Sequence, residues 1–256
     1  AVLLPEIFAL QMTASGDVNF PKTVTSYFSI FDMIARHLPI VETEIGLDHW
    51  PNLYCGVAVL LLLVLYLLNR EIPLKKKLIR MLALIFFLLA FANNWLDFIW
   101  HGMHFPDSLP GRQSFLYMFV LLTMAFEELR RLKGNRIWHV VVAAVACGAF
   151  FVGCALFVDH EMVSMDAILM TAVFLLAYTL LLAIARMAGA YRKICFCMAF
   201  FLAVAETGVN MDLTGVVTTN RTQYTAHWED YEVLNAKAAE QTDGFYRIEK
   251  WDRMTK

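Results

Sequence analysis

The sequence predicts a mainly α-helical membrane protein. We expect a bundle of about six transmembrane helices, an outward segment at the membrane interface before it, and the start of a soluble extracytoplasmic domain after it. Of the 256 residues, 59% are apolar and 17% are charged, whereas soluble domains have about 45–50% and about 25%. The apolar residues form long runs that one soluble core could not enclose on all sides. Every second connection between these runs is strongly basic.

Six apolar runs could cross a hydrocarbon core of about 30 Å, which takes about 20 helical residues. They are Leu53–Leu68, Leu78–Ile99, Ser114–Leu129, Ile137–Val158, Ala167–Ala185 and Ile194–Val209, so the bundle covers residues 53–209. The first, third and sixth runs are short, and we expect snorkelling charges, local thinning or longer helices at their ends. Residues 1–10 are also apolar but lack the basic stretch and cleavage site of a signal peptide. We therefore expect them to be the end of an earlier span.

The charge distribution orients this bundle. If the spans alternate in direction, three connections and the helix ends beside them lie on one side, and they hold twelve of the 21 basic but three of the 23 acidic residues. These connections are Arg70–Lys77 with Arg80, Arg130–Arg136 and Arg186–Lys193. Short loops rich in Lys and Arg stay in the cytoplasm, so the 100–113 loop and the C-terminal segment are predicted to face outward. The formal net charge of −2 gives no indication of a nucleic-acid partner.

The two outward segments differ in character. Residues 11–52 mix apolar side chains with prolines and charges, which is typical of short helices lying at a membrane interface. Residues 210–256 contain two strand-like pieces, Val216–Thr219 and Phe245–Ile248, and a turn signal between them. We interpret this second segment as the start of an extracytoplasmic domain.

No metal site and no disulfide are predicted. All five cysteines lie inside the proposed spans, where they are expected to pack as small apolar residues. The pairs Cys195-x-Cys197 and His101-x-x-His104 each lack the further converging ligands that a soft metal or zinc requires. No cofactor is indicated by the sequence.

Polar side chains cluster at the outer end of the second predicted span and in the loop after it. The candidate site residues are Asn94, Asp97, His101, His104, Asp107 and Arg112. Asn93 and Asp97, four residues apart, are expected to share a helix face, and a carboxylate beside lipid should face protein or a water-filled cavity. Guanidinium and imidazolium groups make charge-assisted bonds to phosphate. The sequence therefore suggests a binding site for the phosphate of a lipid-linked substrate.

A structural interpretation of this loop competes with the functional one. Trp95, Trp100 and Phe105 are the side chains that a membrane aromatic belt requires, and an outward Arg beside lipid headgroups needs no substrate. Two other features lie near the outer ends of the spans. Residues 48–56 are expected to start and anchor the first span, and Glu206 places an ionisable group close to lipid.

The sequence resembles the YfhO family of bacterial multi-span membrane proteins. The most specific stretch is Trp100-His-Gly-Met-His-Phe-Pro-Asp-Ser-Leu-Pro-Gly-Arg-Gln-Ser-Phe. Four other stretches follow the family in the same order: Leu4-Pro-Glu-Ile-Phe-Ala-Leu, Leu47-Asp-His-Trp-Pro-Asn-Leu-Tyr-Cys-Gly, Ile72-Pro-Leu-Lys-Lys-Lys-Leu and Phe245-Tyr-Arg-Ile-Glu. The resemblance covers nearly the whole chain. Where many relatives have an aromatic residue before the arginine of the loop, this chain has Gly111.

The resemblance implies a lipid-donor, GT-C-like glycosyltransferase of the bacterial plasma membrane. Such an enzyme takes a sugar from a polyprenyl-phosphate donor outside the membrane and places it on a cell-wall polymer such as lipoteichoic acid. Family members are several times longer, so this chain would be a fragment from the middle of the protein. The catalytic carboxylate of such enzymes usually lies in an early outward loop, so it is expected upstream of this chain, and no catalytic residue is assigned. Arg112, His101 and His104 would stabilise the departing lipid phosphate.

Two other classes of function are compatible with the sequence. A lipid or polysaccharide transporter or flippase would carry polar residues through the depth of several spans, whereas here they gather at the outer end. A non-catalytic scaffold would position a partner glycosyltransferase or flippase. In each case the expected partners are membrane lipid, a lipid-linked sugar and a cell-wall polymer, and the divalent-metal requirement stays open.

Overall fold

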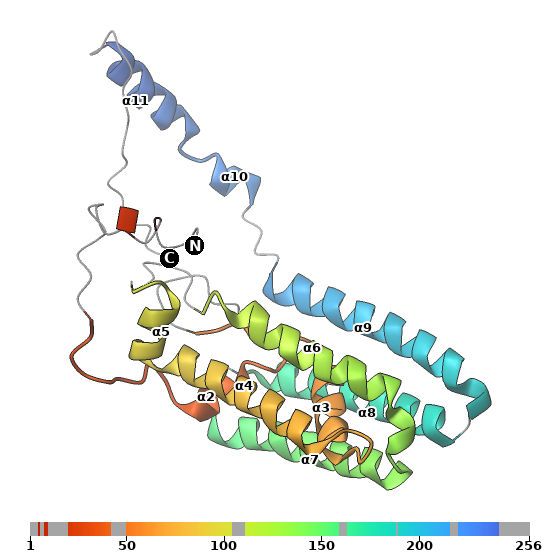
Figure 1. Cartoon of the computed structure of the whole chain (residues 1–256). Coiled ribbons are helices and arrows are strands. Elements are labelled where there is room, and N and C mark those ends of the chain that lie inside the picture. Colours follow the sequence, from red (N-terminus) through yellow and green to blue (C-terminus); the bar gives the residue numbers. More distant parts are fainter. Residues whose placement is uncertain are drawn as a thin grey trace. The chain divides into compact units, whose positions relative to one another are not determined.

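The computed structural model describes residues 5, 8–9, 20–41, 50–103, 111–158, 163–187, 189–215 and 220–240. These residues are mainly helical and include no β-strand (Figure 1). The chain divides into two compact units, residues 1–215 and residues 216–256. The helices of the first unit are α2 (Ile30–Ala35), α3 (Val57–Leu68), α4 (Leu74–Ala92), α5 (Asn94–Trp100), α6 (Ser114–Arg130), α7 (Ile137–Phe157), α8 (Met165–Met187) and α9 (Arg192–Thr214).

Three helical segments are long and apolar enough to cross a membrane: α7, α8 and Gly189–Thr214, which contains α9. They coincide with the fourth, fifth and sixth predicted spans. Many of their apolar side chains are exposed, as at Phe200 and Phe201, which are 64% and 65% exposed. Such surfaces suit a hydrocarbon environment and not water.

The other three predicted spans lie in helices that are too short or too charged to qualify. Helix α3 has 12 residues. Helix α6 has 17 and is therefore about 25 Å long, less than the hydrocarbon thickness. Helix α4 has 19 residues, but Lys75, Lys76, Lys77 and Arg80 occupy its first two turns. By length and composition the described residues thus support three spans and not six.

The predicted span Leu78–Ile99 is interrupted at Asn93, so its prediction as one helix was wrong. Asn93 is extended and forms an isolated antiparallel bridge with Ser26. Its side-chain oxygen accepts hydrogen bonds from the backbone N–H groups of Trp95 and Leu96, at 2.9 and 3.3 Å. This is the geometry of a helix N-cap. Asn93 therefore starts the new helix α5 instead of sharing a helix face with Asp97.

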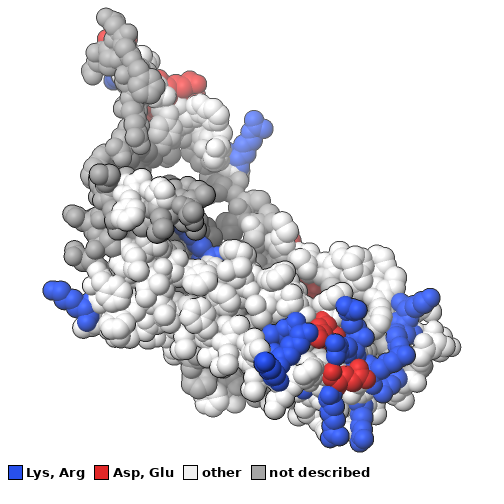
Figure 2. All heavy atoms as spheres, viewed as in Figure 1, with Lys and Arg blue, Asp and Glu red and all other residues white. Residues whose placement is uncertain are grey.

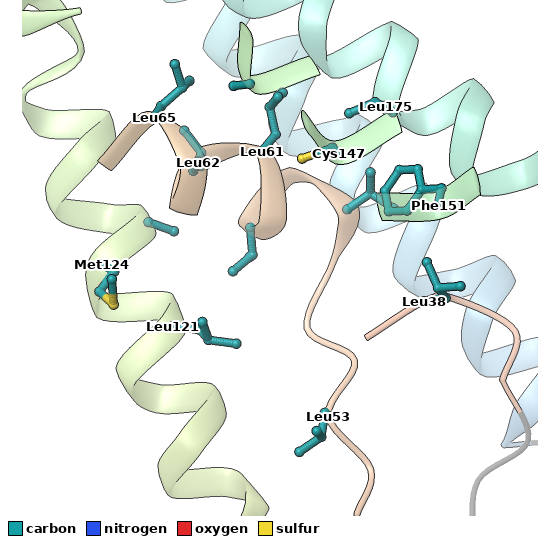
Figure 3. Close-up of a cluster of buried hydrophobic side chains, with 14 of the residues drawn as sticks. Leu38, Leu53, Leu61, Leu62, Leu65, Leu121, Met124, Cys147, Phe151 and Leu175 are labelled. Atoms are coloured by element: carbon teal, nitrogen blue, oxygen red, sulfur yellow. The ribbon is translucent and has the colours of Figure 1, made fainter. Parts of the chain in front are cut away.

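The core of the first unit lies where α3 meets α6, α7 and α8. Figure 3 shows the side chains that fill it, among them Leu61 and Leu65 of α3, Met124 of α6 and Phe151 of α7. Cys147 also packs there, as predicted for an apolar cysteine. In lipid, helices gain little from excluding apolar surface, so van der Waals packing and buried polar contacts must hold them together.

The three basic connections meet at one end of the bundle, where Figure 2 shows lysines and arginines gathered. Asn69, after α3, donates to Glu128 of α6 at 2.8 Å and to the carbonyl of Arg131 at 2.8 Å. Arg186, at the end of α8, donates to the carbonyl of Asn135 at 2.6 Å, before α7. We call this region the basic end. Helices α5 and the start of α6 therefore lie at the other end of the bundle (Figure 1).

The second unit contains α10 (Arg221–Tyr224) and α11 (Trp228–Glu240). The side chain of Asn220 caps α10 by accepting from the backbone N–H of Thr222 at 3.0 Å. Both strand-like pieces predicted in the C-terminal segment lie outside the described residues, as do residues 1–4, 6–7 and 10–19.

Gly134 tests the packing of the basic end. A Cβ atom there would overlap Asn69 Oδ1 and would lie 2.8 Å from Cγ of Glu71. Gly134→Ala should therefore lower the free energy of unfolding by about 1–3 kcal/mol, measured as thermal stability in detergent. Gly148→Ala is the matched control, because a Cβ there meets no atom within 4 Å. Equal effects of the two substitutions would contradict this packing.

Candidate functional site

The candidate site is built on α5, whose short length brings a carboxylate and an imidazole together. Asp97 lies in the first turn of α5 and is 2% exposed, and His101 follows one turn later as the C-cap. His101 Nδ1 lies 3.1 Å from Asp97 Oδ1 and 2.9 Å from the Asp97 carbonyl oxygen. The hydroxyl of Tyr27 donates to Asp97 Oδ2 at 3.1 Å. Asp97 thus fixes the imidazole ring from one side.

This arrangement decides which imidazole nitrogen carries the proton. A carbonyl oxygen can only accept, so Nδ1 of His101 must be the donor. The other nitrogen, Nε2, is buried and has no hydrogen-bond partner among the described residues. Buried polar atoms without partners are rare in proteins and call for an explanation such as a bound ligand or water.

The pKa of His101 is raised above its ordinary value. The main cause is the hydrogen bond to the Asp97 carboxylate, which outweighs the opposing effect of burial. The positive charge of Arg112 acts in the opposite direction and lowers the pKa. The charges of Arg112 and His101 therefore influence each other.

Arg112 is exposed, and its position depends on the residue before it. Gly111 is buried with φ of +64°, a left-handed conformation that suits glycine. A Cβ atom at Gly111 would lie 3.1 Å from Cβ of Pro51. A larger side chain at this position would therefore be strained in its backbone and would require Pro51 to shift.

Gln113 is a further member of the site that the sequence analysis did not single out. It is 2% exposed, it precedes α6 as the N-cap, and neither atom of its amide has a hydrogen-bond partner among the described residues. His101 and Gln113 are the two residues for which the described part of the chain shows such orphaned atoms. Gln113 follows Arg112 in the sequence, and the charge of Arg112 acts on His101. The sequence feature that could have indicated Gln113 is its position next to an arginine at the start of a predicted helix.

Asn94 has a different role from the one predicted. Its Oδ1 accepts from the backbone N–H of Thr25 and its Nδ2 donates to the carbonyl of Thr23, both at 2.9 Å. Because both its oxygen and its nitrogen are hydrogen-bonded, the Asn94 side chain holds residues 23–25 against α5. His104 and Asp107 lie outside the described residues.

A second polar cluster lies beneath the site, around α2 and α6. His37 Nδ1 donates to the carbonyl of Ile34 at 2.8 Å, so Nε2 accepts from the hydroxyl of Tyr117, also at 2.8 Å. Burial lowers the pKa of His37 to about 4, so its ring is neutral at physiological pH. Tyr117 lies one turn after Gln113 on α6. The cluster therefore connects α6 to the end of α2.

Arg36 brings another cation close to Pro51. Its Nε donates to the carbonyl of Pro51 at 3.2 Å and its Nη2 to Oδ1 of Asn52 at 2.7 Å. It also lines a cavity of about 150 Å³ together with Asn52 and Asn210. The carbonyl of Pro51 thus accepts a hydrogen bond from Arg36, and the ring of Pro51 lies close to Gly111. Residues 50–56, expected only to start a span, also organise the site.

Glu206 is buried, and its carboxylate is fully engaged. Oε1 accepts from the Tyr54 hydroxyl at 2.6 Å and from the backbone N–H of Val57 at 2.7 Å, and Oε2 accepts from the Tyr178 hydroxyl at 2.6 Å. The carboxylate therefore caps the N-terminus of α3 and joins α3, α8 and α9. This contact explains an ionisable residue so close to lipid without invoking a ligand.

No group of three His, Cys, Asp or Glu side chains that could hold a metal ion occurs in the part of the chain that the structure describes. The candidate residues offer a positively charged side chain, an imidazole held by a carboxylate and the donor group of a buried amide. Phosphate oxygens are suitable acceptors for all three.

These features define an α-helical membrane protein with a polar site at one end of its bundle. Residues 1–256 match the family described as bacterial membrane protein YfhO, and the chain belongs to this family. No curated protein and no solved structure matches it.

The pairing of Asp97 with His101 should make stability depend on pH. Because the folded-state pKa of His101 is raised, the stabilisation is fully present below the unfolded value of about 6.5 and is lost as pH rises through the folded value. Asp97→Asn should therefore cost about 1–3 kcal/mol at pH 5.5 and less at pH 9. Thermal unfolding in detergent at the two pH values measures this.

Asp230→Asn is the matched control for that measurement. Its partner His227 is 76% exposed, as is Asp230 itself, so their ion pair should contribute little. An effect of Asp97→Asn that is the same at pH 5.5 and pH 9 would contradict the pairing of Asp97 with a charged His101.

Proposed function

We propose that this protein takes part in sugar transfer outside the bacterial plasma membrane, from a polyprenyl-phosphate donor to a cell-wall polymer such as lipoteichoic acid. The observation that carries the proposal is the orphaned Nε2 of His101, buried beside Arg112 at the end of the bundle away from the basic turns. Membership of the YfhO family supports a membrane location. A lipid-linked phosphate is the anion that such a location makes available.

In this proposal the site binds the phosphate that leaves when the sugar is transferred. Arg112 supplies a permanent positive charge. His101 stays protonated to a higher pH than an ordinary histidine, because Asp97 stabilises the imidazolium. The amide nitrogen of Gln113 is a third donor. Donors placed where negative charge develops lower the barrier for departure of the phosphate.

The acceptor hydroxyl needs a base, and none of the described residues is assigned this role. A carboxylate is the expected group. Asp97 is already engaged by Tyr27 and His101, and Glu206 by two tyrosines and a helix N-terminus. We therefore expect the base to come from outside the described residues.

The proposed topology has six spans with the basic end in the cytoplasm. Short basic loops are retained on that side, and the contacts of Asn69, Glu128 and Arg186 support one common side for the three connections. Helix α4 would reach across the membrane with snorkelling lysines at its start, and α3 and α6 with local thinning. The candidate site then faces the outside of the cell.

Substitution of Arg112 tests the proposed function. In the full-length protein Arg112→Gln should lower sugar transfer from a polyprenyl-phosphate donor roughly a hundredfold or more, because the departing phosphate loses its permanent cation. Lys22→Gln is the control. Lys22 is exposed, and its substitution removes the same charge as Arg112→Gln does. Release of radiolabelled sugar by purified protein is the measurement, with membrane insertion checked in parallel.

The same assay separates the proposed enzyme from the alternatives. Normal transfer by the Arg112→Gln protein would contradict the phosphate-binding role. Transfer that requires an added partner glycosyltransferase would indicate a scaffold, and movement of the donor across the membrane without sugar release would indicate a flippase.

A further inference from the structure

A second charged cavity lies at the basic end, far along α6 from the candidate site. It has a volume of about 380 Å³ and is formed where the start of α4 faces the end of α6. Four cations and one carboxylate line it, which gives a formal charge of +3: Lys76, Arg80, Arg130, Arg131 and Glu127. Figure 2 shows this concentration of basic side chains around a few acidic ones.

The cations of this cavity are held in place by their neighbours. Glu127 accepts from Lys76 Nζ at 2.7 Å and from Arg80 Nη1 at 2.6 Å, and lies 3.5 Å from Arg131 Nε. Arg80 also donates to the hydroxyl of Tyr66 at 3.0 Å. The guanidinium groups of Arg80 and Arg130 lie over the rings of Tyr66 and Phe126, at 5.4 and 5.9 Å. One carboxylate cannot neutralise four cations, so the cavity is positively charged and preorganised for an anion.

An apolar groove begins at the wall of this cavity. It has a volume of about 390 Å³ and runs between α3, α6, α8 and α9, where Leu62, Leu129 and Ala199 are among its lining residues. Phe126 lines both the charged cavity and the groove. The charged cavity suits the polar headgroup of an amphiphile, and the adjoining apolar groove suits its hydrocarbon chain.

We propose that this composite site binds an anionic phospholipid, with its phosphate in the charged cavity and an acyl chain in the apolar groove. The charge of the cavity selects the phosphate, and basic pockets between membrane helices bind such headgroups in general. The groove selects a lipid over a free phosphate ion. This site is distinct from the sugar-donor site, because it uses the opposite end of α6 and none of the same residues.

Charge variants test the headgroup position. Lys76→Gln with Arg130→Gln lowers the formal charge of the cavity from +3 to +1, and binding of phosphatidylglycerol to the purified protein should weaken roughly tenfold. Lys75→Gln with Lys133→Gln is the matched control, because these exposed lysines do not line the cavity. Titration followed by native mass spectrometry measures the affinity of the first bound lipid.

A groove variant and a second lipid test the identity of the occupant. Ala199→Phe fills the groove and should weaken phosphatidylglycerol binding, whereas Met198→Phe, on an exposed neighbour outside the groove, should not. Phosphatidylcholine, with no net charge, should bind the unmodified protein more weakly than phosphatidylglycerol does.

Three results would overturn the assignment. The first is equal affinity of the unmodified and Lys76→Gln/Arg130→Gln proteins for phosphatidylglycerol. The second is equal affinity for the anionic and the zwitterionic lipid. The third is binding of inorganic phosphate that depends on the cations while Ala199→Phe leaves phosphatidylglycerol binding unchanged, which would make the cavity a site for free phosphate. None of these results depends on whether sugar transfer occurs.

Discussion

Buried polar groups decide how this bundle holds together, because helices in lipid gain little from excluding apolar surface. At the basic end, Glu128 is fully buried between Asn69 and Asn135, which donate to it at 2.8 and 2.6 Å. Towards the other end, Glu206 joins three helices through two tyrosines and the N-terminus of α3. Each carboxylate is satisfied by donors from other segments of the chain. Among the described residues an orphaned buried polar atom is therefore exceptional, and the proposed phosphate site rests on it.

The orphaned atoms belong to His101, at the end of α5, and to Gln113, at the start of α6. The interruption at Asn93 ends α4 and starts α5, along which Asp97 and the C-cap residue His101 lie one helical turn apart. Pro51 then supports Gly111 on one side and Arg36 on the other. The polar residues of the site are thus held by elements from three distant parts of the chain.

The sequence predicted the helical class, the fourth, fifth and sixth spans and the common end of the bundle at which the basic turns meet. It did not predict the break at Asn93, because the apolar run continues through it and the cause is a bridge to Ser26, 67 positions earlier. The role of Asn94 depends on its long-range partners Thr23 and Thr25, and that of Gln113 on its burial, neither of which the spacing of residues reveals. Glu206 was visible as a charge near lipid, but its three donors come from α3, α8 and the segment before α3.

The central claim is that Nε2 of His101 binds the phosphate of a lipid carrier. Nitrogen NMR of the imidazole side chains tests it directly, with the purified protein and a short-chain polyprenyl phosphate. We expect the Nε2 signal of His101 to shift on addition of the lipid, while His37, whose two nitrogens are bonded to Ile34 and Tyr117, stays unchanged. A His101 signal that does not respond to the lipid phosphate at saturating concentration would contradict the claim.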